Sequence, residues 1–168
     1  MLQDIIIYTP MYVTLFWAIV LLLTRREKNR AKFFLGIFMF SAFLVYLSHA
    51  HFFQKVEIGY IYFNSIYNFS SLAVYPLFYL YVRLLTVESD YKTANLVHMI
   101  PGFLAGISAF IVFMTMSAEE QKTYYQYIID RNSSVENFSL SMHVQKYIFQ
   151  ISRIVFLFQV AFYVFKGQ

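Results

Sequence analysis

Long apolar runs alternate with short polar segments along this chain of 168 residues. Each of five runs is long enough to cross a hydrocarbon core of about 30 Å, which takes about 20 helical residues. They cover residues 5–23, 33–53, 60–85, 96–116 and 147–165. Inside a bilayer each backbone polar group needs a partner, and runs of this length satisfy that need as helices rather than as the ten-residue strands of a β-barrel. We therefore predict an all-α fold, a polytopic transmembrane bundle of about five helices in a single domain spanning residues 1–168.

The composition excludes the main alternatives to a membrane protein. Hydrophobic residues make up 60% of the chain and charged residues only 13%, about half the share in soluble domains. Helices buried in a soluble protein would also need polar faces, which these runs lack. The first run is not typical of a signal peptide, because Asp4 precedes it without any Lys or Arg and no small-residue cleavage site follows.

Positive charge is concentrated in the segment "TRREKNRAK" at residues 24–32, and its distribution predicts the topology. The segment contains Arg25, Arg26, Lys28, Arg30 and Lys32. With the N-terminus outside and the C-terminus inside, eight basic residues face the cytoplasm and four face outward, as the positive-inside rule requires. The five basic side chains can also contact anionic lipid. Two membrane helices hold this segment against lipid and no DNA-reading module surrounds it, so we predict that it contacts no nucleic acid.

The one long connection, residues 117–142, is predicted to lie outside as a loop. Tyr124, Tyr127 and Ile128 recur in it at helical spacing. This spacing indicates a short interfacial helix with its tyrosines at the level of the lipid headgroups.

A positive face is predicted on the last helix. Lys146, Gln150 and Arg153 follow one another at spacings of four and three residues, so they share one side of a helix. No Asp or Glu occurs within the five runs to neutralise this face. A charged side chain inside the membrane costs free energy, so its presence indicates a function. One interpretation is a pocket for an anionic or polar ligand, open to the outside. The other is structural: Arg153 snorkels outward, or bonds carbonyls and Asn side chains within the bundle.

The third helix carries a matching polar stripe. Its members recur at spacings of three and four: Tyr60, Asn64, Tyr67, Asn68, Ser71 and Tyr75. An amide facing lipid costs several kcal/mol when unsatisfied, so the stripe faces protein or a wet cavity. It serves either helix–helix bonding or a ligand cavity shared with Arg153. The candidate ligand-binding residues are Asn64, Tyr67, Asn68, Gln150 and Arg153.

No enzymatic, cofactor or metal site is predicted. The chain has no Cys, and no P-loop, GxGxxG, GxSxG or HExxH string. The apolar runs contain no carboxylate pair for acid–base chemistry. His49 and His51 stand two residues apart and do not share a helix face, so only a cluster that adds His143 remains as a metal or pH-sensing alternative.

Gly102 and Gly106 form a GxxxG pair in the fourth run, a pattern typical of close helix packing. The partner is either another helix of the chain or a second copy in a homodimer.

Three phrases, "PLFYLYVRLLT", "HMIPGF" and "RIVFLFQVAFYVFKG", resemble the membrane-embedded N-terminal domain of bacterial AraC-family transcriptional regulators. The resemblance implies a multi-pass domain in the bacterial inner membrane that passes a signal to a cytoplasmic helix-turn-helix output. The sequence ends at Gln168 without a DNA-binding domain, so we expect either part of a longer regulator or a stand-alone relative. DNA would be contacted only through the missing domain; the expected partners are the bilayer and an unknown small ligand or membrane protein.

Two alternatives to a sensor remain, a small transporter or channel component and an orphan integral membrane protein. Transporters often contain internal repeats, and the five runs show no convincing one. A flux assay in liposomes distinguishes a transporter or channel from a sensor, since a sensor should move no solute.

Overall fold

The computed structural model describes residues 2–23, 30–55, 59–86, 97–130 and 138–166, and it is all-helical. Its helices are α1 (Leu2–Leu22), α2 (Arg30–Phe53), α3 (Tyr60–Thr86), α4 (Ile100–Thr115), α5 (Ala118–Asp130) and α6 (Leu140–Lys166). All of these except α5 are long and apolar enough to cross a membrane, α4 when its preceding turn from Val97 is included. The predicted fold class, a bundle of five membrane-spanning helices, is confirmed.

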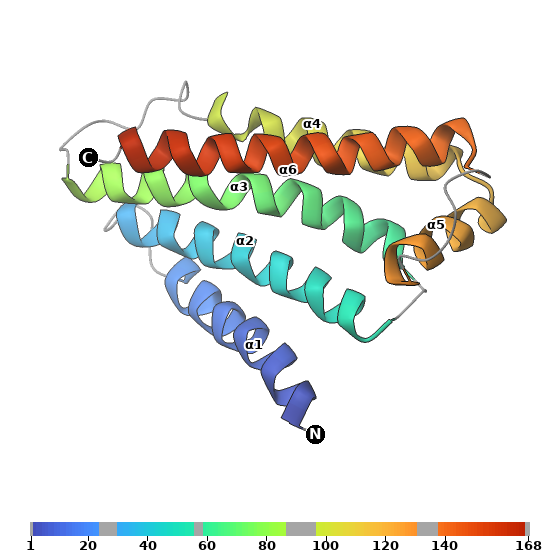
Figure 1. Cartoon of the computed structure of the whole chain (residues 1–168). Coiled ribbons are helices and arrows are strands. Elements are labelled where there is room, and N and C mark those ends of the chain that lie inside the picture. Colours follow the sequence, from blue (N-terminus) through green and yellow to red (C-terminus); the bar gives the residue numbers. More distant parts are fainter. Residues whose placement is uncertain (1, 24–29, 56–58, 87–96, 131–137, 167–168) are drawn as a thin grey trace.

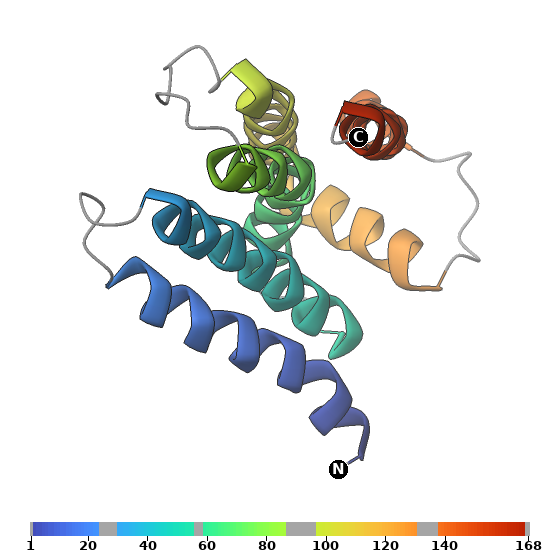
Figure 2. The ribbon, with the colours of Figure 1, turned by 90° about the vertical axis from the view of Figure 1, so that its left-hand side faces the viewer.

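The long helices lie side by side, and each of α1 to α4 runs in the direction opposite to the one before it (Figure 1). α1 packs on α2 and α2 packs on α3, whereas α3, α4 and α6 contact one another. α5 lies across one end of the bundle, where α2 ends and α3 and α6 begin (Figures 1 and 2). We call this end the α5 end, and the opposite end, where α6 reaches Lys166, the far end.

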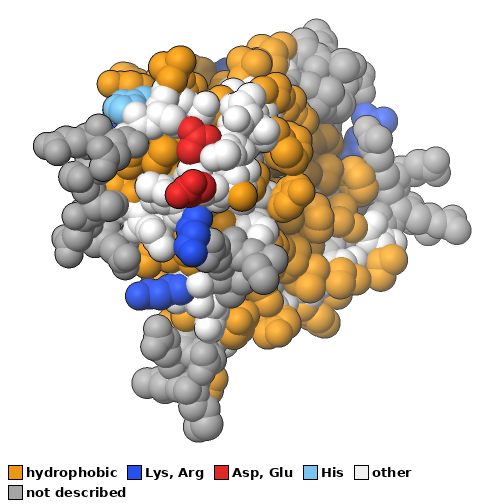
Figure 3. Space-filling model, turned by 90° about the vertical axis from the view of Figure 1, so that its right-hand side faces the viewer, with side chains coloured by type: hydrophobic (Ala, Val, Ile, Leu, Met, Phe, Trp, Pro, Cys, Tyr) orange, Lys and Arg blue, Asp and Glu red, His pale blue; other side chains and the backbone are white. Residues whose placement is uncertain are grey.

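Large apolar side chains cover the outside of the long helices. Phe16 of α1, Leu104 of α4 and Phe158 of α6 are each at least 60% exposed. In water such a surface would aggregate, whereas in a bilayer it is solvated by lipid. At the α5 end, charged side chains lie beside a flank of hydrophobic side chains (Figure 3). These features make the chain a membrane protein.

The GxxxG pair packs within the chain, against α3. A Cβ atom on Gly102 would lie 2.9 Å from the carbonyl oxygen of Phe69, and one on Gly106 would lie 2.8 Å from the Cβ of Phe69. Only glycine allows α4 to approach α3 this closely. Contact with α3 therefore accounts for the GxxxG spacing without a second copy of the chain.

Helix α5 forms as predicted, and one of its tyrosines is buried within the protein. Tyr124 is 1% exposed and packs edge-on against Phe113 of α4, with ring centroids 5.6 Å apart. Burial raises the pKa of its phenol. The apolar side of α5 forms a core with Tyr60, Met116 and Met142, and the level of its tyrosines relative to the lipid headgroups stays a prediction.

Two helix boundaries differ from the predicted ones by several residues. α6 begins at Leu140 rather than at 147, because its first two turns are helical but too polar to register as an apolar run. α4 begins at Ile100 rather than at 96, because Pro101 occupies its first turn, where a missing N–H costs nothing.

Helix α5 begins with a capping box. The backbone N–H of Ser117 donates to the Glu120 carboxylate at 2.7 Å, and the N–H of Glu120 donates to the Ser117 hydroxyl at 3.3 Å. Ser139, which caps α6 by accepting from the N–H of Met142, also bonds Glu120. The bonds from Ser139 and then Ser117 lower the pKa of Glu120.

We expect Glu120→Gln to weaken the junction between α5 and α6 at pH 7, because a neutral amide accepts these bonds less strongly. In the unsubstituted protein the contribution is present above the ordinary glutamate pKa of about 4.3. It is lost as the pH falls through the lowered pKa of the folded state. Amide hydrogen-exchange protection at Ser117 and Met142 measures it. Glu119→Gln is the matched control; equal protection in the two variants would contradict the prediction.

Candidate functional site

A cavity of about 540 Å³ lies between α2, α3, α5 and α6 near the α5 end. Its volume falls in the range of small-molecule sites. Its lining is Ser48, His49 and Phe52 of α2; Tyr60, Phe63, Asn64 and Tyr67 of α3; Tyr124, Tyr127 and Ile128 of α5; and Lys146, Phe149, Gln150 and Arg153 of α6. The site therefore depends on the packing of four helices.

A second space of about 260 Å³ continues from the cavity toward the far end, between α3 and α6. The two spaces share Tyr67, Phe149 and Arg153. The second space, which we call the groove, is also lined by three polar residues and two apolar ones: Asn68, Ser71, Ser152, Phe156 and Leu157.

The structure brings the five candidate residues together. Asn64, Tyr67, Gln150 and Arg153 line the cavity, and Asn68 lines the groove. The predicted faces of α3 and α6 thus meet across one space. That a ligand binds there remains a prediction.

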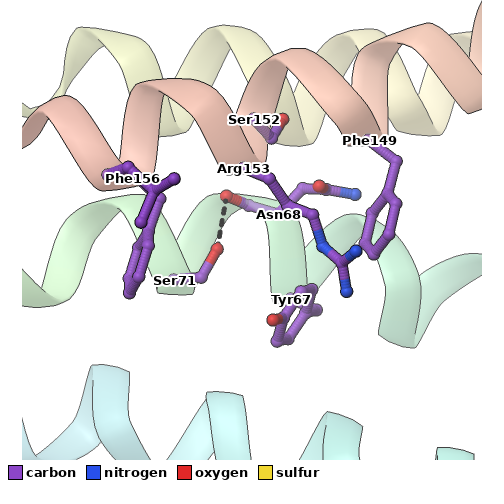
Figure 4. Close-up of a pocket in the computed structure, with 8 residues that line it drawn as sticks. Tyr67, Asn68, Ser71, Phe149, Ser152, Arg153 and Phe156 are labelled. Atoms are coloured by element: carbon purple, nitrogen blue, oxygen red, sulfur yellow. Dashed lines mark hydrogen bonds between the residues drawn. The ribbon is translucent and has the colours of Figure 1, made fainter.

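Arg153 extends toward the α5 end, along α6. Its guanidinium carbon lies 4.6 Å from the ring centroid of Phe149, one turn earlier, and Figure 4 shows the side chain above Tyr67. The Nζ of Lys146 lies 5.7 Å from the ring centroid of Tyr127. Cation–π contacts of this kind stabilise a cation only modestly. No Asp or Glu is among the described residues that line the cavity or the groove, so neither cation faces a carboxylate there.

The two asparagines of α3 differ in how their amides are satisfied. The Nδ2 of Asn68 donates to the backbone oxygen of Asn64 at 2.9 Å, and the Ser71 hydroxyl donates to the backbone oxygen of Asn68 at 3.3 Å (Figure 4). The Nδ2 of Asn64 is buried and has no hydrogen-bond partner among the described residues. Leaving such a donor unsatisfied costs about 1–3 kcal/mol. Asn64 is therefore a donor in the cavity wall that a ligand can satisfy.

The histidines near the α5 end lie in separate aromatic environments. His49 lies 5.2 Å from Tyr67 between ring centroids, and His51 stacks on Phe63 at 3.5 Å. The Nδ1 of His143 lies 3.0 Å from the backbone oxygen of Ser139. Within the described ranges, no group of three His, Asp or Glu side chains is arranged to hold a metal ion.

The cavity contains residues that were not predicted as part of a site. Phe52 and Phe63 are two phenylalanines among many in the chain, and nothing in their local sequence distinguishes them. Tyr124 and Tyr127 did recur at helical spacing, but only the fold of α5 under the bundle directs them to the cavity. These four side chains contribute aromatic walls to the cavity.

The basic residues predicted to mark the topology are described only in part. Arg30 and Lys32 are exposed in the first turn of α2, at the far end of the bundle. Arg25, Arg26 and Lys28 lie outside the described residues.

Comparisons of the whole chain with protein-family models, with curated proteins and with solved structures found no match. Any functional conclusion therefore depends on the geometry of the cavity.

Proposed function

We propose that the chain is a sensory domain of the bacterial inner membrane, in which a ligand in the cavity shifts α6. The observation that carries the proposal is the pairing of Lys146 and Arg153 on one face of α6 with the unsatisfied amide of Asn64 on α3, across a space of ligand size. A ligand that contacts both helices binds one arrangement of them better than another. Such differential affinity is the energetic requirement of a sensor.

The packing of α6 supports movement of this helix. Only five of its residues are buried, and three of these are polar: Gln145, Ser152 and Gln159. Both amide atoms of Gln145 and the Oε1 of Gln159 are buried without a hydrogen-bond partner in the described structure. Each unsatisfied group weakens the interface by about 1–3 kcal/mol. A second arrangement of α6 that satisfies some of them would recover part of this free energy.

The far end of α6 carries the contacts through which a shift would be passed on. The Tyr163 hydroxyl and the Nδ1 of His98, just before α4, lie 2.9 Å apart. The Nζ of Lys166 lies 5.1 Å from the ring centroid of Tyr79 on α3. A movement of α6 must change these contacts. In the predicted topology they lie on the cytoplasmic side, where a DNA-binding output of the AraC type would be placed.

We expect the far ends of α3 and α6 to change separation when a ligand binds. Spin labels attached to Leu85→Cys and Phe165→Cys report this distance, because both side chains are exposed and the chain has no other Cys. In nanodiscs, an organic extract of a bacterial culture should shift the distance distribution by about 2 Å or more, the size of known helix shifts.

Arg153→Ala should abolish this response while leaving membrane insertion intact. Lys122→Ala is the matched control, because Lys122 is exposed on α5 and does not line the cavity. An Arg153→Ala protein that responds normally, or an unchanging distance in the unsubstituted protein, would contradict the proposal.

A further inference from the structure

The cavity and the groove adjoin at Tyr67, Phe149 and Arg153, and together they show a gradient of polarity. Near the α5 end the walls carry Lys146, Gln150 and the Arg153 guanidinium, together with the unpartnered Nδ2 of Asn64, a residue 8% exposed. Toward the far end the exposed atoms of the groove are mainly apolar, including those of Phe156 and Leu157, although Asn68, Ser71 and Ser152 also line it. The space is thus cationic at one end and apolar at the other.

The gradient runs along α6. Lys146 precedes Arg153 by seven residues on α6, so the cationic part spans about 10 Å at the helical rise. The groove follows it in the direction of Phe156, deeper in the bundle. A lipid in the leaflet at the α5 end has the same polarity, with its headgroup at the surface and its chain pointing inward.

The space is accessible from the side as well. Leu157, in the wall of the groove, is 66% exposed on the lipid-facing surface of α6. Arg153 itself is an exposed residue. An alkyl chain can therefore enter between α3 and α6 without leaving the hydrocarbon, while its headgroup stays at the level of the cations.

We infer that the cavity binds an anionic amphiphile, with a carboxylate or phosphate headgroup at Arg153 and Lys146 and an alkyl chain in the groove. A guanidinium binds either headgroup through charge-assisted hydrogen bonds, and no carboxylate among the described residues lines the cavity or the groove to compete for it. The inference rests on the proposed sensory function and names its ligand class. The amphiphile comes either from free single-chain acids or from anionic phospholipid of the bilayer.

Binding of radiolabelled dodecanoate to the full chain in phosphatidylcholine nanodiscs tests this inference, with empty nanodiscs subtracted. We expect one saturable site per chain. Dodecanol, dodecyltrimethylammonium and acetate should each compete at least about ten-fold less well than unlabelled dodecanoate, because each lacks the anion or the chain. Equal competition by any of the three would overturn the inference.

Phosphatidylglycerol added to the nanodiscs distinguishes the two sources of the ligand. Competition with dodecanoate would support an anionic amphiphile drawn from the bilayer. Retained dodecanoate binding would support a free single-chain acid.

Substitution of the cations provides a second measurement. Arg153→Gln should weaken dodecanoate binding about ten-fold or more, the usual effect of removing one charge-assisted bond, and Lys146→Gln should weaken it less. Lys122→Gln on the exposed side of α5 should bind as the unsubstituted protein does. Unchanged binding in Arg153→Gln would overturn the inference. The competition series on the unsubstituted protein decides it independently of how well the variants fold.

The two proposals fail in different ways. Saturable dodecanoate binding without a shift of α6 would uphold the ligand class and contradict the sensor. A shift of α6 induced by the culture extract, with no dodecanoate binding, would uphold the sensor and overturn the ligand class.

Discussion

A reporter enzyme active only outside the cytoplasm is expected to be inactive when fused after Lys32 and active when fused after Asp130. Lys32 closes the basic segment after α1, and Asp130 ends α5 at the opposite end of the bundle. A basic segment resists transfer across the membrane, so we expect α1 to be oriented with the N-terminus outside. The effect is close to all-or-none, because a reporter lies on one side of the membrane or the other.

A fusion after Gln54, which follows α2 at the α5 end, is the matched control and should be active. A reporter active only in the cytoplasm should give the reverse pattern at all three positions. Activity of the same reporter after both Lys32 and Asp130 would contradict the topology, and with it the cytoplasmic placement of the far end of α6.

Gly106→Leu is expected to destabilise the bundle by about 3 kcal/mol, the upper part of the range for overpacked cores. Even a Cβ atom at this position would lie 2.8 Å from the Cβ of Phe69 and 3.2 Å from the backbone oxygen of Ser65. Relief of the clash requires α4 to move away from α3. Because α4 and α3 both contact α6, the cavity should be disturbed as well.

Unfolding by SDS titration in mixed micelles measures this loss as a lower midpoint. Leu104→Phe is the matched control: it also adds volume on α4, but at a side chain that is 65% exposed to lipid. Gly106→Ala should lie between the two, since the gain in helix propensity offsets part of its clash. A midpoint for Gly106→Leu equal to that of Leu104→Phe would contradict the close α3–α4 contact.

The spanning helices could be predicted from hydropathy because lipid demands long apolar segments with satisfied backbones. The same signal failed where a helix leaves the hydrocarbon. The first turns of α6, from Leu140, contain His143 and Lys146, so no apolar pattern marks them. They are held instead by the Ser139 cap and its bond to Glu120, and the second of these joins residues 19 apart.

The candidate site was predictable to the extent that it depends on single helices. The spacing of Asn64, Tyr67 and Asn68, and that of Gln150 and Arg153, identified one face on each helix. That these faces meet, and that α5 closes the space with Tyr124 and Tyr127, follows from contacts between segments about 60 to 90 residues apart. Helical periodicity carries no information on such contacts.

The sequence by itself determined that lipid is the solvent of this chain, how many helices cross it and which side chains share a helix face. These properties depend on local composition and on the 3.6-residue period. Only the tertiary structure decided that the GxxxG pair packs on Phe69 of α3, that Tyr124 is buried and that two cations share a cavity with Asn64. Each depends on how helices pack against one another, which is a property of surfaces assembled from distant parts of the chain.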